Sequence, residues 1–445
     1  MTRTRQTAPH VLVAGAGMAG LAAARALTDR GARVTVFDAR DRVGGRVWTI
    51  RDGFAQRQHA EGGADLLESD QTAVMSLARE LRLPLVPILK RGFGFYGTGA
   101  NGRRSMQGSA RNLAALFAPF WPAVAQYRLL EGRWSSPLAQ ALARESVADY
   151  LKRTGASAAA VARMRGLRGF FLADPEDLSM IALVDFLATD GFGGDGTTFR
   201  VKGGNDRLAT AMAAQLVSPV QLRSVLRRVR QTARGVVATI EGPSGRHDVA
   251  GDALIVALPA TAVRDVVFAP ALSDAQWTAM CTLQYGGATR VLLQFASRFW
   301  VRARRPLAFG SDLPTGAVWD GNEQQTGPAG ILSLLAGGRA ADAMVALLNK
   351  DGAAGITRRL GWLGRPSRVL ASHVVRWNDD PWVGGGYAVF DPQFDPRGRD
   401  LLAQSCGRVS FAGEHTSIRW QGYVNGAVES GQRAATEALL ASGVI

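Results

Sequence analysis

Cysteine is nearly absent from this chain, because its 445 residues include only Cys281 and Cys406. The two cysteines form no CxxC pair, and the five histidines lack the spacing of metal ligands. Neither a disulfide framework nor a thiolate metal site is indicated, and we expect no bound metal. Isolated thiols of this kind are typical of proteins in a reducing compartment.

Long hydrophobic runs are also missing. The first ten residues lead directly into an apolar strand, without the hydrophobic core of a signal peptide. The longest apolar run, near residues 253–263, contains Pro259 and is far too short to cross a bilayer. We therefore predict a cytoplasmic protein without a membrane span.

Lysine is rare although the chain is strongly basic. The formal net charge is +15, yet 48 of the 52 basic residues are arginine. The four lysines are Lys90, Lys152, Lys202 and Lys350. The basic residues are scattered, with only short clusters at 227–230 and 302–305. This pattern favours a solvated surface over a nucleic-acid interface, so we expect no nucleic-acid partner.

The most informative motif is a glycine turn near the N-terminus. An apolar strand over residues 10–14 leads into Gly15, Gly17 and Gly20, which form GxGxxG at the start of an Ala-rich helix. These glycines allow a tight turn, close approach of a pyrophosphate and close helix–strand packing. Asp38 ends a second strand about 20 residues further on, where a carboxylate can accept ribose hydroxyls. Together these features predict a site for an ADP-containing cofactor.

A second glycine turn follows the first one. Gly44 and Gly45 precede Arg46, whose guanidinium can meet a phosphate through two parallel hydrogen bonds. This addition favours a flavin over a nicotinamide dinucleotide.

Six blocks of sequence, in this order, resemble the flavin amine oxidase family, which includes amine and amino-acid oxidases. The blocks are DARDRVGGRVWT (38–49), AEGGADLL (60–67), VKGGNDRLATAMA (201–213), DALIVALP (252–259), RWNDDPWVGGGY (376–387) and FAGEHTSIRWQGYVNGAVESGQRAA (411–435). The resemblance implies an α/β fold with a Rossmann-like FAD-binding domain of the glutathione-reductase type. It also implies an α+β substrate-binding domain, and FAD contacts from Arg40, Gly62, Gly63 and Val225.

The positions of these motifs predict how the chain divides into domains. The length favours two or three domains, and 47% hydrophobic residues suffice for sizeable cores. We expect a discontinuous FAD-binding domain from residues 1–95, 200–275 and 396–445. Residues 96–199 and 276–395 are then the substrate-binding domain. Helical periodicity over 105–192 predicts helices there, whereas 276–395 mixes strands with one helix near 339–350.

The resemblance also implies the chemistry, which is hydride transfer from a carbon that bears nitrogen to the flavin. Tyr387 and Tyr423 match the family's two upright aromatic side chains, which hold an uncharged amine before the flavin. Trp377 matches a tryptophan that packs beside the ring. Glu414, preceded by Gly413, matches the acid that hydrogen-bonds the ribityl chain. A helix starting near Val424 should aim its positive end at the flavin pyrimidine.

Two positions depart from the family pattern. Some relatives bind flavin covalently through a cysteine directly before the first cage tyrosine, but this chain has Gly386 there, so we predict noncovalent FAD. The family's lysine, which reaches the flavin through a water, is replaced by Arg290. Arginine stays charged and offers no acceptor. Arg290 could support the reduced flavin or dioxygen reduction, bind a substrate carboxylate, or pair with a nearby acid, and the sequence leaves these open.

The leading interpretation is an FAD-dependent oxidase or dehydrogenase that converts an amine to an imine, with dioxygen or another acceptor reoxidising the flavin. An L-amino-acid oxidase is the nearest alternative. A C–C desaturase has no need of the paired tyrosines. A noncatalytic binding protein similar to Rab GDP-dissociation inhibitors does not explain the phosphate glycines with Glu414. The sequence leaves open the amine, the electron acceptor and whether the chain forms a homodimer.

Overall fold

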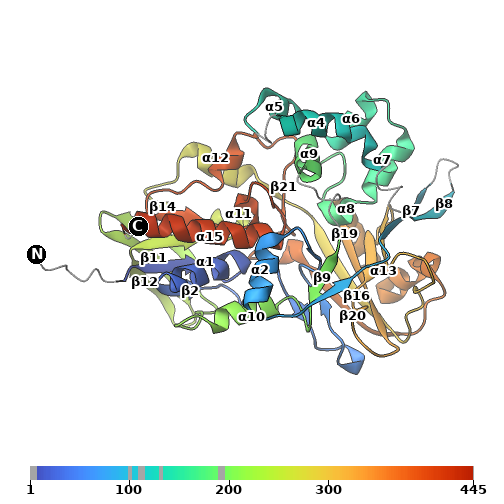
Figure 1. The fold of residues 1–445 in the computed structure, drawn as a ribbon, viewed down its shortest axis with the longest axis horizontal. Helices are drawn as coiled ribbons and strands as arrows, with labels where there is room; N and C mark the ends of the chain where they lie inside the picture. The colour runs from blue at the N-terminus through green and yellow to red at the C-terminus, as the bar shows by residue number, and fades with distance from the viewer. Residues whose placement is uncertain (1–7, 99–102, 109–115, 130–133, 189–195, 444–445) are drawn as a thin grey trace, which may run out of the picture.

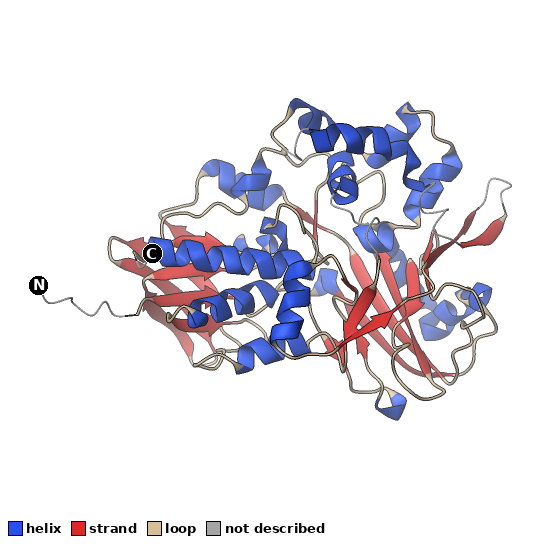
Figure 2. Ribbon diagram, viewed as in Figure 1, coloured by secondary structure: helices blue, strands red, loops and turns tan. Residues whose placement is uncertain are grey.

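The structure is a computed structural model with an α/β architecture (Figures 1 and 2). It describes residues 8–98, 103–108, 116–129, 134–188 and 196–443. A parallel sheet and its helices lie on one side, a seven-stranded sheet lies on the other, and a layer of short helices covers the top of the view.

The parallel sheet has the strand order β2-β1-β13-β22. Its strands are β1 (His10–Ala14), β2 (Arg33–Phe37), β13 (Ala253–Val256) and β22 (Val409–Phe411). Alternate side chains of β1 enter two different cores: Val11 and Val13 pack with helices α1 (Met18–Asp29) and α15 (Val424–Ala441), and Leu12 and Ala14 face the other way. Both faces are therefore covered, as in other parallel sheets.

A second sheet, of order β12-β11-β10-β14, covers the other face of the parallel sheet. Its strands are β10 (Val225–Thr232), β11 (Gly235–Gly242), β12 (Gly245–Gly251) and β14 (Val267–Ala269). The neighbouring strands β12 and β13 belong to two different sheets, because β12 pairs with β11 whereas β13 pairs with β1 and β22.

The largest sheet has the strand order β20-β16-β19-β18-β17-β7-β8. In chain order its strands are β7 (Phe93–Thr98), β8 (Arg104–Gly108), β16 (Ala288–Phe295), β17 (Ala308–Ser311), β18 (Ala317–Asp320), β19 (Gly330–Gly337) and β20 (Val369–Arg376). All of β16 is buried. Its odd-numbered apolar residues, Val291, Leu293 and Phe295, pack on the face covered by helix α13 (Arg339–Arg359). Arg290 therefore points to the opposite face.

The layer of short helices corrects the helical prediction for residues 105–192 at one end. Its helices are α4 (Trp121–Leu129), α5 (Pro137–Ala143), α6 (Val147–Arg153), α7 (Ala158–Arg165), α8 (Arg168–Phe171) and α9 (Met180–Ala188). Residues 105–108 belong to strand β8 rather than to a helix, because they pair with β7. Residues 137–153, within the range predicted as helical, form two helices, because the Ser146 side chain accepts from the Asp149 backbone and caps a new start at Val147. Part of the 105–192 prediction lies outside the described residues.

The single helix expected near 339–350 is longer in the structure. Helix α13 continues to Arg359 and is kinked at Gly352, whose φ of 60° lies outside the helical range.

The remaining elements are short connections around these layers. The strands are β3 (Thr49–Ile50), β4 (Ala60–Glu61), β5 (Leu67–Glu68), β6 (Leu85–Ile88), β9 (Thr198–Val201), β15 (Gln284–Tyr285) and β21 (Ala388–Val389). The helices are α2 (Thr72–Glu80), α10 (Arg207–Ala214), α11 (Ala260–Val263), α12 (Asp274–Thr282) and α14 (Gly398–Leu401). The 3-10 turns are η1 (Ala55–Arg57), η2 (Ala118–Phe120), η3 (Gly361–Leu363), η4 (Trp377–Asp379) and η5 (Glu414–Thr416).

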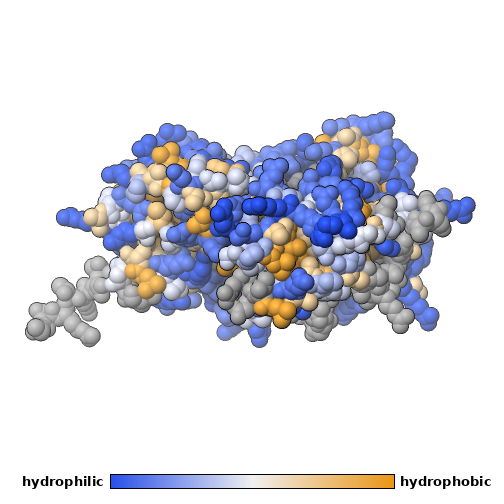
Figure 3. Space-filling view, turned by 90° about the horizontal axis from the view of Figure 1, so that it is seen from above, coloured by the Kyte–Doolittle hydropathy of each residue, from blue (hydrophilic) through white to orange (hydrophobic). Residues whose placement is uncertain are grey.

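The surface is mixed in character. On the face seen from above, hydrophobic residues form separate small groups among hydrophilic ones (Figure 3). None of the helices within the described residues has the length and apolar character needed to cross a membrane. The cellular compartment remains a prediction from the sequence.

Candidate active site

A cavity of about 620 Å³ extends from the carboxyl ends of β1 and β2 to the seven-stranded sheet. Every residue predicted for the site lines this cavity except Gly20 and Gly62. The cavity therefore brings together side chains from all three segments that carry the sequence motifs, including Val225 at the start of β10. No cluster of metal-binding side chains occurs within the described part of the chain.

The GxGxxG turn has the steric properties that a dinucleotide needs. Gly15 has a φ of 100°, and a Cβ there would lie 2.5 Å from the carbonyl oxygen of Ala257. A Cβ on Gly20 would lie 1.8 Å from the carbonyl oxygen of Gly15, so glycine allows α1 to pack close to β1. Gly17, just before α1, lines the cavity and has no atom within 4 Å of the place a Cβ would take. This open position lies beside the free N–H groups of the helix N-terminus, where a pyrophosphate fits.

The second glycine turn lies against the first. Gly44 and Gly45 have positive φ values of 94° and 56°, and the N–H of Gly44 donates to the carbonyl oxygen of Ala16 at 2.8 Å. A Cβ on Gly45 would lie 3.4 Å from the Cα of Gly17. Both turns thus border the same end of α1.

Asp38 directly follows β2 and is only 8% exposed. Its carboxylate accepts hydrogen bonds from the backbone N–H groups of Ala16 (2.6 Å) and Arg40 (2.8 Å). Burial raises the pKa of Asp38, although these two hydrogen bonds oppose the shift. The Arg40 guanidinium makes two hydrogen bonds of 2.7 Å to Asp380. Their contacts with a cofactor remain predictions.

Trp377 is fixed against the third glycine pair. It is buried, and its indole N–H donates to the carbonyl oxygen of Gly62 at 3.2 Å. A Cβ on Gly63 would lie 1.8 Å from the carbonyl oxygen of Arg46, so glycine is required for this close approach. The indole and this loop together form part of the cavity wall.

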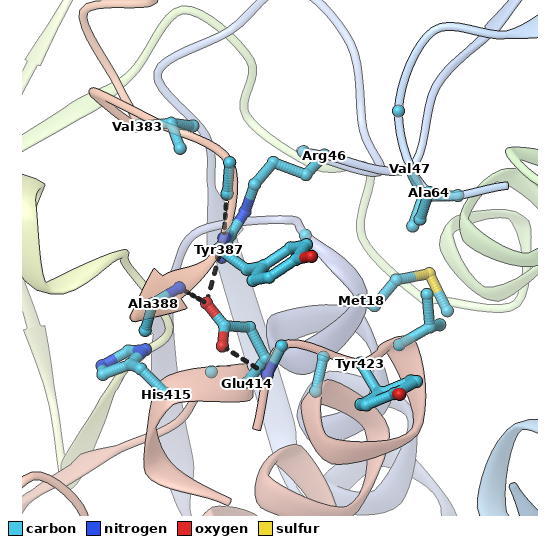
Figure 4. A pocket seen from close by; sticks show the side chains of 18 of the residues that line it. Met18, Arg46, Val47, Ala64, Val383, Tyr387, Ala388, Glu414, His415 and Tyr423 are labelled. Carbon is cyan, nitrogen blue, oxygen red and sulfur yellow. Dashed lines mark hydrogen bonds and ion pairs between the residues drawn. The ribbon is translucent and has the colours of Figure 1, made fainter. Parts of the chain in front are cut away.

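Arg46, which is partly buried, and the buried Glu414 form a connection between three segments (Figure 4). Glu414 accepts from the Arg46 guanidinium (3.0 Å) and from the backbone N–H groups of Ala388 (3.2 Å) and Gly422 (2.8 Å). Arg46 also donates to the carbonyl oxygen of Gly386. Burial acts to lower the pKa of Arg46, but the charges of Glu414 and Tyr285 and their hydrogen bonds with Arg46 together outweigh it, so the pKa is raised. The contacts predicted for Arg46 with a phosphate and for Glu414 with the ribityl chain stay predictions, because the hydrogen bonds described here are all to other protein groups.

Glu414 thereby connects the two segments that carry Tyr387 and Tyr423. Tyr387 and Tyr423 both line the cavity, and a Cβ on Gly422 would lie 3.2 Å from the Tyr387 ring. Burial raises the pKa of each tyrosine far above its usual value, so both phenols stay neutral. Phe186 lies nearly parallel to Tyr423, with 6.4 Å between ring centroids, and Trp420 meets the Tyr423 ring edge-on.

Arg290 lies on the cavity wall and is buried, with 5% exposed. Its Nη1 donates to the carbonyl oxygen of Glu61 (3.1 Å), to Asp65 (3.3 Å) and to Ser333 (3.3 Å). The guanidinium also lies 5.0 Å from the Trp319 ring centroid. Pairing with an acid, one of the three roles open at the sequence level, is therefore present. The other two roles are not tested by this contact.

Asp65 is shared between two arginines. Its carboxylate also accepts from Arg200 (2.5 Å) and from the Trp319 indole N–H (2.6 Å), and Arg200 is only 1% exposed. Glu61 is buried nearby, and burial, with the charge of Asp65, raises its pKa to about 8. Arg200, Arg290, Asp65 and Glu61 form one buried cluster. At neutral pH Glu61 is protonated, so the cluster holds two guanidinium cations and the carboxylate of Asp65.

The pKa of Glu61 predicts a pH-dependent stability. Its side chain binds a proton in the folded state up to about pH 8 but releases it near 4.5 when unfolded, so stability falls as the pH rises between these values. Between about pH 6 and about pH 8, we expect wild type to lose about 2 kcal/mol relative to Glu61→Gln. Urea unfolding midpoints at both pH values measure this. Glu80→Gln, at an exposed site, is the control, and its urea midpoint should change with pH as that of wild type does. If the midpoints of wild type and Glu61→Gln change equally with pH, the raised pKa of Glu61 is wrong.

The model of the family described as flavin containing amine oxidoreductase matches residues 18–439, nearly the whole chain. The chain belongs to this family. An L-amino-acid oxidase of Siganus canaliculatus is 28% identical to this chain, and the alignment covers 97% of this chain and 85% of the relative. Flavin-containing amine oxidase B of Canis lupus familiaris is 25% identical, covering 98% and 87%. A double mutant of putrescine oxidase has the same fold, with a TM-score of 0.85 and 24% identity over 97% of this chain and 99% of that one.

The cavity of this flavin amine oxidoreductase fits FAD. Gly17 leaves open space at the end of α1, and Asp38 lines the same cavity, as the predicted pyrophosphate and ribose contacts require. His415 also lines the cavity, and its buried Nδ1 has no hydrogen-bond partner within the described residues. Burial lowers the pKa of His415 to about 4, so a neutral imidazole faces this site.

Several residues that shape the site were not predicted from the sequence. They are Asp65, Phe186, Arg200, Tyr285, Trp319, Asp380 and His415. Asp65 had a local signal, because a charged residue follows a glycine pair inside the apolar block AEGGADLL. Phe186 and Trp319 had none, since only tertiary packing brings them to the cavity.

Proposed function

We propose that this protein is an FAD-dependent enzyme that oxidises a C–N bond of an amine to an imine, which water then hydrolyses. When bound, FAD supplies the acceptor for the hydride that leaves the carbon next to nitrogen. Dioxygen, giving hydrogen peroxide, or another acceptor then takes the electrons. The observation that carries this proposal is that Tyr387 and Tyr423 line the same cavity as the dinucleotide turn at Gly17.

The two tyrosines hold the substrate in place. Both phenols are neutral because burial raises their pKa values, so the rings present π faces to an uncharged amine rather than a charge. Tyr387 is packed on Gly422, and the Tyr423 ring has the rings of Phe186 and Trp420 as neighbours. Rings held this firmly lose little entropy when a substrate binds. The aromatic lining also keeps water from the reacting bond.

FAD is held without a covalent bond in this proposal. Gly386 occupies the position where some relatives carry a cysteine, and a Cβ there would lie 2.1 Å from Leu172 Cδ1. A side chain at this position would therefore require Leu172 to move. No thiol is present there to form a thioether.

Two of the alternative functions receive no support from the site. A C–C desaturase makes no use of the paired tyrosines. A noncatalytic binding protein leaves the open phosphate turn at Gly17 without a purpose. An amino acid is itself an amine, so an L-amino-acid oxidase would use the same chemistry with an added carboxylate site.

The proposal predicts that suitable amines bleach the yellow holoenzyme when mixed without oxygen. A panel of monoamines, cyclic secondary amines and amino acids identifies the class of substrate. Tyr423→Ala should slow flavin reduction by about 10- to 100-fold, because the amine is no longer held in a reactive position. Stopped-flow absorbance measures the rate. Tyr423→Phe keeps the ring and should retain most of the wild-type rate.

FAD content and folding are measured beside the rates. Tyr423→Ala should keep a full complement of FAD, because its ring is not needed for the phosphate turn. If no amine of any class reduces the flavin, the proposed function is wrong. If Tyr423→Ala reduces at the wild-type rate, Tyr423 is not part of the cage.

A further inference from the structure

Ala388, which directly follows Tyr387, is held by two side chains from the segment that carries Tyr423. Its backbone N–H donates to Glu414 Oε1 at 3.2 Å (Figure 4), and its carbonyl oxygen accepts a hydrogen bond from the Gln421 side chain. Ala388 is only 1% exposed, so bulk water does not replace these partners. We call the side chains of Glu414 and Gln421 the Ala388 clasp.

The clasp also reaches the residue directly before Tyr423. Glu414 Oε2 accepts a hydrogen bond from the backbone N–H of Gly422 at 2.8 Å. Gly422 has a φ of 83°, and a Cβ there would lie 3.2 Å from the Tyr387 ring. One carboxylate therefore joins the residue after Tyr387 to the residue before Tyr423.

The two phenols are not held in place by their own hydroxyl groups. Neither the Tyr387 nor the Tyr423 hydroxyl makes a hydrogen bond to another residue in the described part of the chain. The Tyr423 ring instead has the rings of Phe186 and Trp420 as neighbours, with centroids 6.4 and 5.6 Å away. The position of each phenol therefore depends on its backbone and on packing, and the clasp fixes the two backbones relative to each other.

We propose that the Ala388 clasp holds Tyr387 and Tyr423 at the spacing that a reacting amine requires. Glu414 and Gln421 are then positioning residues. The inference rests on the proposed amine oxidation and adds the residues that set the geometry of its aromatic cage. Neither clasp side chain has to touch the substrate, since both act through the backbone of the tyrosine segments. A displacement of about 1 Å at a reacting centre can slow a reaction by about 100-fold, so a small loosening of the clasp is measurable.

Gln421→Met tests the clasp, because methionine keeps the length of the side chain and removes its donor. The limiting rate of anaerobic flavin reduction, with a saturating amine that reduces wild type, should fall by about 10-fold. The dissociation constants of the amine and of FAD should stay within about threefold, because both tyrosines and the phosphate turn are unchanged. Stopped-flow absorbance and FAD titration measure these values. Gln393→Met, at an exposed site outside the cavity lining, is the control and should match wild type.

The Tyr423→Ala background shows whether the effect passes through the cage. In that background, Gln421→Met should slow flavin reduction by less than about twofold, because the ring that the clasp positions is absent. Equal slowing in both backgrounds would overturn the inference, and so would a wild-type limiting rate in Gln421→Met. A purely structural role would lower the urea midpoint and leave the limiting rate of the folded holoenzyme unchanged, which also contradicts the inference.

Glu414→Gln is the second variant, because the glutamine side chain accepts through only one oxygen atom. The N–H of either Ala388 or Gly422 then lacks its acceptor, and the limiting rate should fall at least as far as in Gln421→Met. A lower affinity for FAD with a wild-type rate in the loaded fraction would assign Glu414 to the cofactor and remove it from the clasp. The variant also leaves Arg46 without its charge partner, so Gln421→Met decides the inference if Glu414→Gln does not fold.

Hydrogen exchange tests the clasp without catalysis. In the oxidised holoenzyme, mass spectrometry should show faster amide exchange over residues 386–389 in Gln421→Met than in wild type, because the Ala388 peptide group is released. Unchanged exchange in Gln421→Met would overturn the inference. If no amine reduces the flavin of wild type, the proposed function is wrong, and the exchange result alone decides whether the clasp holds these segments.

Discussion

Replacing Asp65 with asparagine is expected to destabilise the folded holoenzyme by about 3–5 kcal/mol, the range for breaking a buried ion pair. Asp65 is 4% exposed and is the carboxylate shared by Arg200 and Arg290. Without its charge, two guanidinium groups remain buried with no ionised partner, because Glu61 is protonated at neutral pH. The midpoint of urea unfolding at saturating FAD measures the loss.

A double variant shows whether charge is the reason. Arg290→Met alone should cost much less, since it leaves one cation and one anion. In that background, Asp65→Asn leaves one unpaired arginine instead of two. Its added cost should therefore be smaller than in wild type by about 1 kcal/mol or more, which is the coupling expected for charges in contact. Equal costs in both backgrounds would mean that Asp65 acts through hydrogen bonds alone.

The local sequence was sufficient to predict the dinucleotide turn. Gly15, Gly17 and Gly20 were recognised from their spacing between a predicted strand and a predicted helix. The structure has β1 and α1 at these positions. The start of α15 at Val424 was also predicted correctly. The steric requirements of this turn involve residues that are close together in the chain, so they can be recognised from the sequence.

The environment of Arg290 could not be predicted in the same way. Its register on β16 places it opposite Val375 and Leu335, but its charge partner is Asp65, 225 residues earlier in the chain. Trp319 and Phe186 reach the same cavity from other elements. Spacing within one segment has no information about such contacts, because they depend on how the sheet packs against the glycine loop. The sequence therefore left three roles of Arg290 open, and the structure shows one of them, the pairing with an acid.

Two details of the range predicted as helical, residues 105–192, were missed for reasons of the same kind. The pattern over 137–153 has helical periodicity throughout, but Ser146 caps a second helix and interrupts the first. Residues 105–108 form a strand because β7 offers an edge for pairing. Periodicity does not detect an available sheet edge.

Replacing Gly17 with valine should abolish FAD binding while leaving the protein folded. A Cβ at this position meets no atom within 4 Å, and the backbone φ of −71° suits any residue, so the apoprotein has no clash. The added side chain instead fills the position proposed for the pyrophosphate. Losing two hydrogen bonds to phosphate oxygens should weaken FAD binding by about 100- to 1,000-fold. Titration of the apoprotein with FAD, followed by flavin fluorescence, measures this.

Gly361→Val is the matched control, because Gly361 also has an open Cβ position but does not line the cavity. Both apoproteins should unfold at the same urea concentration as wild-type apoprotein, and only Gly17→Val should lose FAD. Gly20→Val would be uninformative here, since its side chain would clash with the carbonyl of Gly15 and disturb the fold itself. Full FAD binding by Gly17→Val would place the pyrophosphate elsewhere, and the path of the cofactor toward Tyr387 and Tyr423 would then be wrong.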